Sequence, residues 1–157
     1  MELRHHPLVP PHRGGTLHTW GRARHGALGL ATDSDVDVPR SLAGLPRVRQ
    51  VACGEMHCVA LAADGTVLTW GSGLMGALGN GDLGTCRTPS AVLALRTAAP
   101  IVEIAAGRHH SLALSLSGDA FHWGMCGGAI GECHTVPRQR ADLNGRATSV
   151  ACGDDFC

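Results

Sequence analysis

The feature that most constrains the fold is an internal repeat. Three short markers recur in a fixed order: Ala-(Cys/Ala)-Gly, Trp-Gly and Gly-Ala-(Leu/Ile)-Gly. The first lies at residues 52–54, 105–107 and 151–153, the second at 20–21, 70–71 and 123–124, and the third at 26–29, 76–79 and 128–131. Trp20, Trp70 and Trp123 are 50 and 53 residues apart. Ordered markers at one period indicate units that bury their apolar surfaces against their neighbours.

Each unit reads as four short strands. In the most complete unit, β-capable runs cover residues 48–53, 58–62 and 66–70, and a weaker fourth run covers 90–95 after Pro89. Asp64-Gly65 between two such runs predicts a tight hairpin in which both turn residues have positive φ. Residues 91–99 could equally form a short helical turn, and no longer span shows a helical period. Four strands in about 50 residues are typical of a propeller blade.

The chain starts and ends inside a unit. Residues 16–20 correspond to a third strand, 32–39 to an acidic loop and 40–45 to a fourth strand, whereas the unit that begins at residue 148 stops at 157. The 157 residues suffice for a domain with its own core, but a seven-bladed ring needs roughly 350. We therefore expect a fragment of a longer propeller; the alternative is that the missing strands are too degenerate to detect.

Composition narrows the class of partner. The 13 basic residues balance 13 acidic ones, so no electrostatic footprint points to nucleic acid or to an anionic membrane. No apolar run approaches the length of a membrane span. Seven cysteines without a signal peptide favour a thiol-reduced, intracellular protein, cytoplasmic or nuclear.

The repeat resembles that of the regulator of chromosome condensation family, Ile-Ala-x-Gly-x-x-His-Ser-x-Ala-Leu, then Asp-Gly, then Trp-Gly-x-Asn-x-x-Gly-Gln-Leu-Gly. Residues 51–61, 64–65 and 70–79 match nearly every signature position, and residues 104–114 match more closely still. The resemblance implies a β-propeller that acts as a binding platform. The expected fold is all-β, a partial propeller of about three blades built from four-stranded repeats of roughly 50 residues. The expected organisation is a disordered lead at 1–14, then a partial repeat at 15–46, full repeats at 47–97 and 98–146, and a partial repeat at 147–157.

Two motifs that could indicate a cofactor or a metal are better explained by the repeat. Residues 71–76 fit Gly-x-Gly-x-x-Gly, but no helix can follow Gly76, as a dinucleotide site requires. Cys53, His57 and Cys58 could suggest zinc, yet Ala106 and Ser111 take the cysteine positions in the next unit, which marks small packed sites. We expect no cofactor, no metal and no catalytic residues.

The histidines of the repeat predict structural roles, and the residues before them predict a contact surface. His57 and His110 share one position, and Phe156 takes it in the last unit, so we expect a packed ring with one nitrogen bonded to nearby backbone. The preceding residues vary, as exposed loop tips on a rigid scaffold do. In the family's guanine-nucleotide exchange member, the resemblance implies that exchange residues come from this loop. The candidate partner contacts are Glu55, Met56, Arg108, His109, Asp154 and Asp155.

The favoured function is a non-catalytic protein-interaction scaffold within a larger propeller protein. One alternative is part of a guanine-nucleotide exchange factor for a Ran-like small GTPase, which needs no nucleophile because it works by distorting the nucleotide site. Another is the substrate-recognition propeller of a ubiquitin ligase. All three functions are family-level expectations, because one fold serves many functions.

Overall fold

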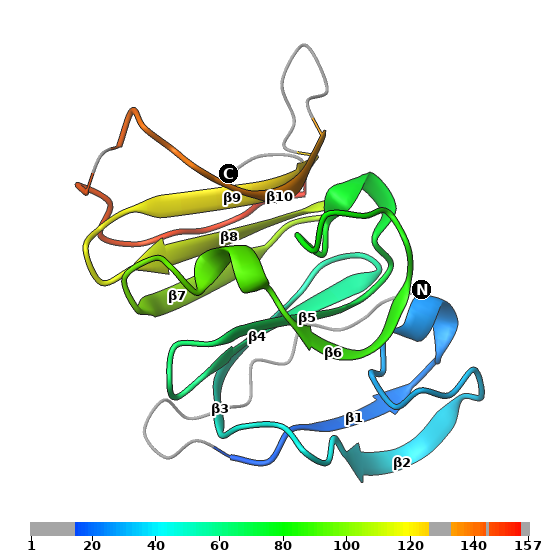
Figure 1. The fold of residues 1–157 in the computed structure, drawn as a ribbon. Helices are drawn as coiled ribbons and strands as arrows, with labels where there is room; N and C mark the ends of the chain where they lie inside the picture. The colour runs from blue at the N-terminus through cyan, green and yellow to red at the C-terminus, as the bar shows by residue number, and fades with distance from the viewer. Residues whose placement is uncertain (1–14, 126–132, 144, 155–157) are drawn as a thin grey trace.

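Three antiparallel sheets follow one another along the chain. The computed structural model describes residues 15–125, 133–143 and 145–154. The first sheet pairs β1 (His18–Gly21) with β2 (Val36–Ser41). The second has the order β3 (Val48–Cys53), β4 (His57–Ala62), β5 (Val67–Gly71) and β6 (Cys86–Ala91). The third repeats that order with β7 (Ile101–Ala106), β8 (His110–Ser115), β9 (Ala120–Met125) and β10 (Cys133–Gln139). Figure 1 shows the three sheets one above another, each forming one blade or part of one.

The predicted all-β class is confirmed. Within the described residues the helical segments are short 3₁₀ turns: η1 (Arg24–Gly26), η2 (Leu74–Gly76) and η3 (Leu93–Leu95). The turn at η3 is one of the two forms that the sequence allowed for residues 91–99. None of the described helical segments is long and apolar enough to cross a membrane. The predicted lead at residues 1–14 and the Gly-rich loop at 128–131 lie outside the described residues.

The fourth strands were placed too late along the chain. The sequence predicted them at residues 40–45 and 90–95, whereas β2 and β6 start four residues earlier in each case, at Val36 and Cys86. Each of these strands contains a proline, and Pro89 was wrongly taken as the residue before the strand. β6 is the edge of its sheet, and proline is tolerated on an edge because the missing N–H faces no partner strand.

The Asp64-Gly65 hairpin also differs from the prediction. Only Gly65 has positive φ, at 86°, so the loop is not a two-residue turn. Ala62 accepts a hydrogen bond from the Gly65 N–H at 3.0 Å and donates to the Thr66 carbonyl at 2.9 Å. This is a three-residue loop with glycine in the left-handed region, which the dipeptide signal alone does not separate from the shorter turn.

The core lies between neighbouring sheets. Between the second and third sheets, the buried side chains are Val59, Leu61, Val67, Val92, Leu95, Ile101, Ile104, Ala113 and Trp123. Between the first and second, they are Leu42, Val48, Ala60, Leu68 and Trp70. Each unit therefore buries its apolar face against its neighbour, as the repeat predicted.

A tryptophan binds each complete blade to the blade before it. The Trp70 Nε1–H donates to the Ala27 carbonyl at 2.9 Å, and the Trp123 Nε1–H donates to the Ala77 carbonyl at the same distance. Both acceptors lie in the Gly-Ala-Leu-Gly loop of the preceding unit. The two rings are 1% and 0% exposed, and burying a ring of about 200 Å² stabilises by roughly 5 kcal/mol. Trp20 has no preceding loop among the described residues and is 57% exposed.

A second link satisfies the edge of the third sheet. β7 ends that sheet, and its Ile104 would otherwise present an unpaired amide to the second sheet. The Gln50 side chain on β3 donates to the Ile104 carbonyl at 2.8 Å and accepts from the Ile104 N–H at 3.0 Å. One side chain thus satisfies both backbone groups of Ile104 at this edge.

The tryptophan contact predicts that position 79 requires a glycine. Gly79 has φ of 69°, and a Cβ there would lie 2.8 Å from the Trp123 ring. Gly44 has φ of 77° with nothing within 4 Å. Ala at either position carries the left-handed backbone cost of about 1–2 kcal/mol, and only Gly79→Ala adds an overpacking cost of about 1–3 kcal/mol. Urea unfolding should therefore show a larger loss for Gly79→Ala than for Gly44→Ala; equal losses would mean that the Trp123 contact is not constrained by this glycine.

Candidate partner-binding face

The turns that carry the predicted contact residues form a row. The β3–β4 turn, the β7–β8 turn and the equivalent segment of the last unit are joined by backbone hydrogen bonds. The Glu55 N–H donates to the Arg108 carbonyl at 3.2 Å, and the Arg108 N–H donates to the Asp154 carbonyl at 2.8 Å. We call residues 54–56, 107–109 and 153–154 the turn row. It brings together five of the six predicted contact residues, and the sixth, Asp155, lies outside the described residues.

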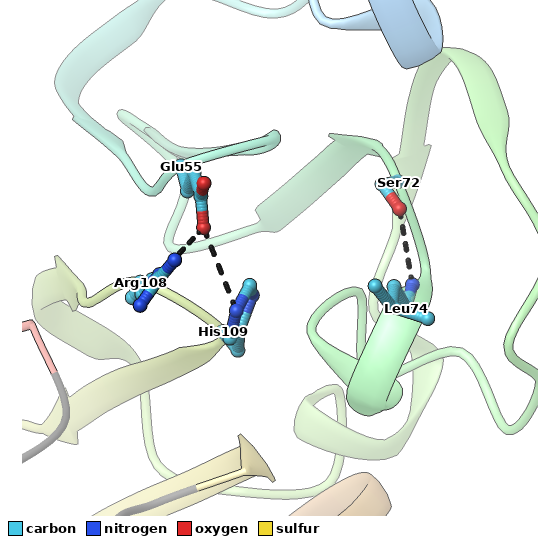
Figure 2. Close-up of polar contacts among 5 residues, drawn as sticks. All are labelled: Glu55, Ser72, Leu74, Arg108 and His109. Atoms are coloured by element: carbon cyan, nitrogen blue, oxygen red, sulfur yellow. Dashed lines mark hydrogen bonds and ion pairs between the residues drawn. The ribbon is translucent and has the colours of Figure 1, made fainter.

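An ion pair crosses from one blade to the next within the turn row. Arg108 Nε donates to Glu55 Oε2 at 2.7 Å, and His109 Nε2 lies 3.5 Å from the same oxygen (Figure 2). The hydrogen bond from Arg108 is the main reason that the pKa of Glu55 is lowered, and the charges of Arg108 and His109 add to it. Glu55, Arg108 and Asp154 are exposed, whereas Met56 and His109 are half-buried. The row therefore presents side chains of alternating charge.

Beneath the turn row, His57 links the second blade to the third. The buried His57 ring bonds through Nε2 to Ser111 Oγ at 2.9 Å, and Ser111 Oγ donates to the Ala77 carbonyl at 3.0 Å. The serine can donate only once, so His57 Nε2 carries the proton. The ring is packed, as the sequence predicted, and its Nε2 bonds to a hydroxyl of the next blade, a partner that the sequence did not indicate.

Burial keeps His57 neutral. It lowers the pKa of His57 to about 4, mainly through loss of hydration and partly through the neighbouring His110 and His109. A neutral imidazole suits the Ser111 contact, because the ring needs only one N–H there. Its role in these contacts is to join two blades.

Sequence reasoning did not place the loop of residues 71–76 beside the turn row. The Ser72 N–H, just after β5, donates to the Met56 carbonyl at 2.7 Å, and Ser72 Oγ accepts from the Leu74 N–H at 3.2 Å (Figure 2). Leu74 is 47% exposed and so places an apolar side chain in the loop after the row. The signal in the sequence was a leucine directly after Gly73, in a Gly-rich turn.

The two motifs that resembled ligand sites take part in packing. Residues 71–76 include the three-residue η2 and lead directly to Ala77, the acceptor for Trp123. The His57 ring contacts Ser111, and the Sγ atoms of Cys53 and Cys58 lie 3.6 Å apart. In the part of the chain that the structure describes, no three His, Cys, Asp or Glu side chains gather as metal ligands would.

The fold and the sequence both match known propeller repeats. The profile of the regulator of chromosome condensation (RCC1) repeat matches residues 14–61 and 64–114. The chain belongs to this repeat family. An alignment of 99 residues with the human probable E3 ubiquitin-protein ligase HERC3 shows 46% identity. The aligned residues cover 61% of this chain and 9% of HERC3. The match confirms the family that the repeat predicted.

Solved structures agree with the assignment. Human WBSCR16 superposes with a TM-score of 0.72 at 30% identity, over 90% of this chain and 39% of that one. Prp20p from Saccharomyces cerevisiae superposes with a TM-score of 0.71 at 26% identity, over 88% and 38%. The propeller architecture is thus confirmed, and the chain is part of a β-propeller interaction scaffold. It spans well under half the length of each of these three relatives.

The neutral His57 predicts how stability depends on pH. Its folded pKa of about 4 lies below the ordinary 6.5, so between these values the unfolded chain binds a proton that the folded chain excludes. Stability should fall as the pH drops through this window, by roughly 3 kcal/mol from this residue. Urea unfolding of the chain and of His57→Phe at about pH 7 and about pH 4.5 measures the effect.

Phenylalanine is a suitable replacement because Phe156 holds this position in the last unit. His57→Phe should flatten the pH dependence, and the same substitution at the exposed His18 should leave it unchanged. An unaltered pH dependence in His57→Phe would show that other groups cause the loss of stability in acid.

Proposed function

We propose that this chain is a section of a non-catalytic scaffold that binds a protein partner through the turn row. The observation that carries the proposal is the pair of backbone bonds that fix Glu55, Arg108 and Asp154 at equivalent places in successive units. Their backbone is held by neighbouring blades, whereas their exposed side chains differ in charge. Variable side chains on a fixed backbone are what binding loops on a rigid scaffold present.

The physical features of the row support binding. Because the inter-blade bonds already order the turns, a partner has little loop entropy to remove. The alternating charges favour a partner of complementary pattern and disfavour one that places like charges opposite them. The exposed Leu74 beside the row adds an apolar contact.

The relatives support a protein as the partner. Prp20p has been crystallised and its binding to Gsp1p and histones described, and it has also been crystallised with Kap60. These partners belong to Prp20p, and their diversity is consistent with a propeller that serves as a platform. The identity of this chain's partner stays a proposal, as does its expected intracellular location.

The central test is a comparison of three chains in quantitative affinity capture. The double variant Arg108→Ala/His109→Ala should lose partners that the unsubstituted chain retains. Arg96→Ala removes an exposed arginine just before β7, at the opposite end of that strand from Arg108, and should keep those partners. Direct titration of a lost partner should show affinity at least about tenfold weaker for the double variant, or about 1.4 kcal/mol. Retention of every partner by the double variant would contradict the proposal.

Exchange activity on a Ran-like GTPase is a second candidate, supported by the likeness to Prp20p. If it is present, the chain should accelerate release of fluorescent GDP from such a GTPase, and Arg108→Ala/His109→Ala should reduce the acceleration. Binding to the GTPase without faster release would leave the scaffold function and exclude exchange by this chain.

Substrate recognition in a ubiquitin ligase is the other alternative. The 46% identity to HERC3 favours it, but the chain covers 9% of that protein. Partners captured through the turn row would be its candidate substrates. Their ubiquitination by a larger protein containing this chain would separate this function from a purely structural scaffold.

A further inference from the structure

Two cysteines face each other at the base of the turn row. We propose that Cys53 and Cys58 form a redox-active dithiol that reacts with low-molecular-weight disulfides such as oxidised glutathione. Cys53 is the attacking thiol and Cys58 the resolving thiol, and the product is an internal disulfide between β3 and β4. This is a modification site distinct from the binding of a protein partner.

The strand register brings the two sulfurs into reach. Cys53 and Cys58 are directly opposed across the antiparallel pair, with their Sγ atoms 3.6 Å apart. The Gly54 N–H donates to the His57 carbonyl at 2.8 Å, which makes the adjoining Cys53–Cys58 pair a non-hydrogen-bonded one. In such pairs the Cα atoms lie about 4.5 Å apart, within the range of about 4.4–6.8 Å seen in disulfides. Closure therefore needs a side-chain adjustment and no change of register.

The two thiols differ in exposure and in pKa, and both differences match the roles of attacking and resolving thiol. Cys53 is exposed and accepts the S–H of Cys58, which lowers the pKa of the Cys53 thiol. Cys58 is less exposed, also lies 3.6 Å from the Ala27 carbonyl, and has a raised pKa because of Cys53 and burial. An accessible thiolate attacks, and the protected thiol waits until a mixed disulfide has formed beside it.

The reaction balances in two exchange steps. The Cys53 thiolate attacks one sulfur of oxidised glutathione, forms a mixed disulfide and releases one glutathione thiolate. Cys58 then loses its proton and attacks Cys53 Sγ, which releases the second glutathione. The protein loses two protons and two electrons, and the small disulfide is reduced to two thiols.

The next blade shows that packing does not require this pair. Ala106 and Ser111 occupy the positions of Cys53 and Cys58, and Ser111 Oγ contacts the Ala77 carbonyl as Cys58 Sγ contacts that of Ala27. The substitutions Cys53→Ala and Cys58→Ser therefore reproduce side chains that the same blade geometry already accepts. They are matched controls expected to keep the fold.

The test is thiol mapping of the full 157-residue chain after exposure to oxidised glutathione. Free thiols are alkylated, and peptides are identified by mass spectrometry, in buffer and in denaturing urea. In buffer, Cys53 and Cys58 should join with loss of about 2 Da, at least about tenfold faster than the pair closes in urea. The exposed Cys133 should show at most a mixed disulfide.

The variants separate the two roles. Cys58→Ser should stop at one glutathione on Cys53, and Cys53→Ala should leave Cys58 unmodified over the same time. Equal rates of closure in buffer and urea would overturn the proposal, because pairing would then reflect only the five-residue separation. A mixed disulfide on Cys53 that Cys58 never resolves, or a pair no more reactive than Cys133, would overturn it as well.

Discussion

The structure depends on a single contact, the indole of one blade against the Gly-Ala-Leu-Gly loop of the blade before it. The hydrogen bonds of Trp70 to Ala27 and of Trp123 to Ala77 fix where each loop lies, and the packed rings exclude water from this contact between blades, which we call the seam. The carbonyls of Ala27 and Ala77 also contact the side chains of Cys58 and Ser111. The same loop therefore positions the second strand of the blade that follows it. The turns that precede these strands then align, so the turn row follows from the seam.

The sequence predicted the blades because its markers are themselves the contacts. Tryptophan and the glycine loop recur at one period because the tryptophan of each blade contacts the glycine loop of the blade before it. Their spacing alone was enough to identify the repeat. The fourth strands were misplaced because the prolines in β2 and β6 look like breakers in the sequence, whereas at a sheet edge they break nothing. Whether a proline lies on an edge strand depends on the order of strands in the sheet, and the local sequence does not specify that order.

For the partner-binding face, the sequence identified the candidate contact residues but not the ion pair between them. Variation beside a fixed glycine and histidine singled out Glu55 and Arg108, yet the two lie 53 residues apart and nothing local indicated an ion pair. Gln50 and Glu103 occupy equivalent positions in successive blades, but their side chains make different hydrogen bonds. Gln50 both donates to and accepts from Ile104, whereas Glu103 only accepts, from Val150 and Ser149. A pair such as Glu55 and Arg108 becomes predictable only when residues one repeat period apart are known to lie side by side on neighbouring blades.

Cys58 connects the seam with the face. Its sulfur lies beside the Ala27 carbonyl, which is also the acceptor of Trp70, and beside Cys53, which directly precedes the turn of Glu55. Closing a disulfide to Cys53 removes the S–H of Cys58 and fixes the base of the turn. The Trp70 bond remains, so the seam keeps its stronger donor while the turn loses freedom. Oxidation at this pair would therefore act on the turn row more than on the packing of the blades, whereas the third blade, with Ala106 and Ser111, has no such response.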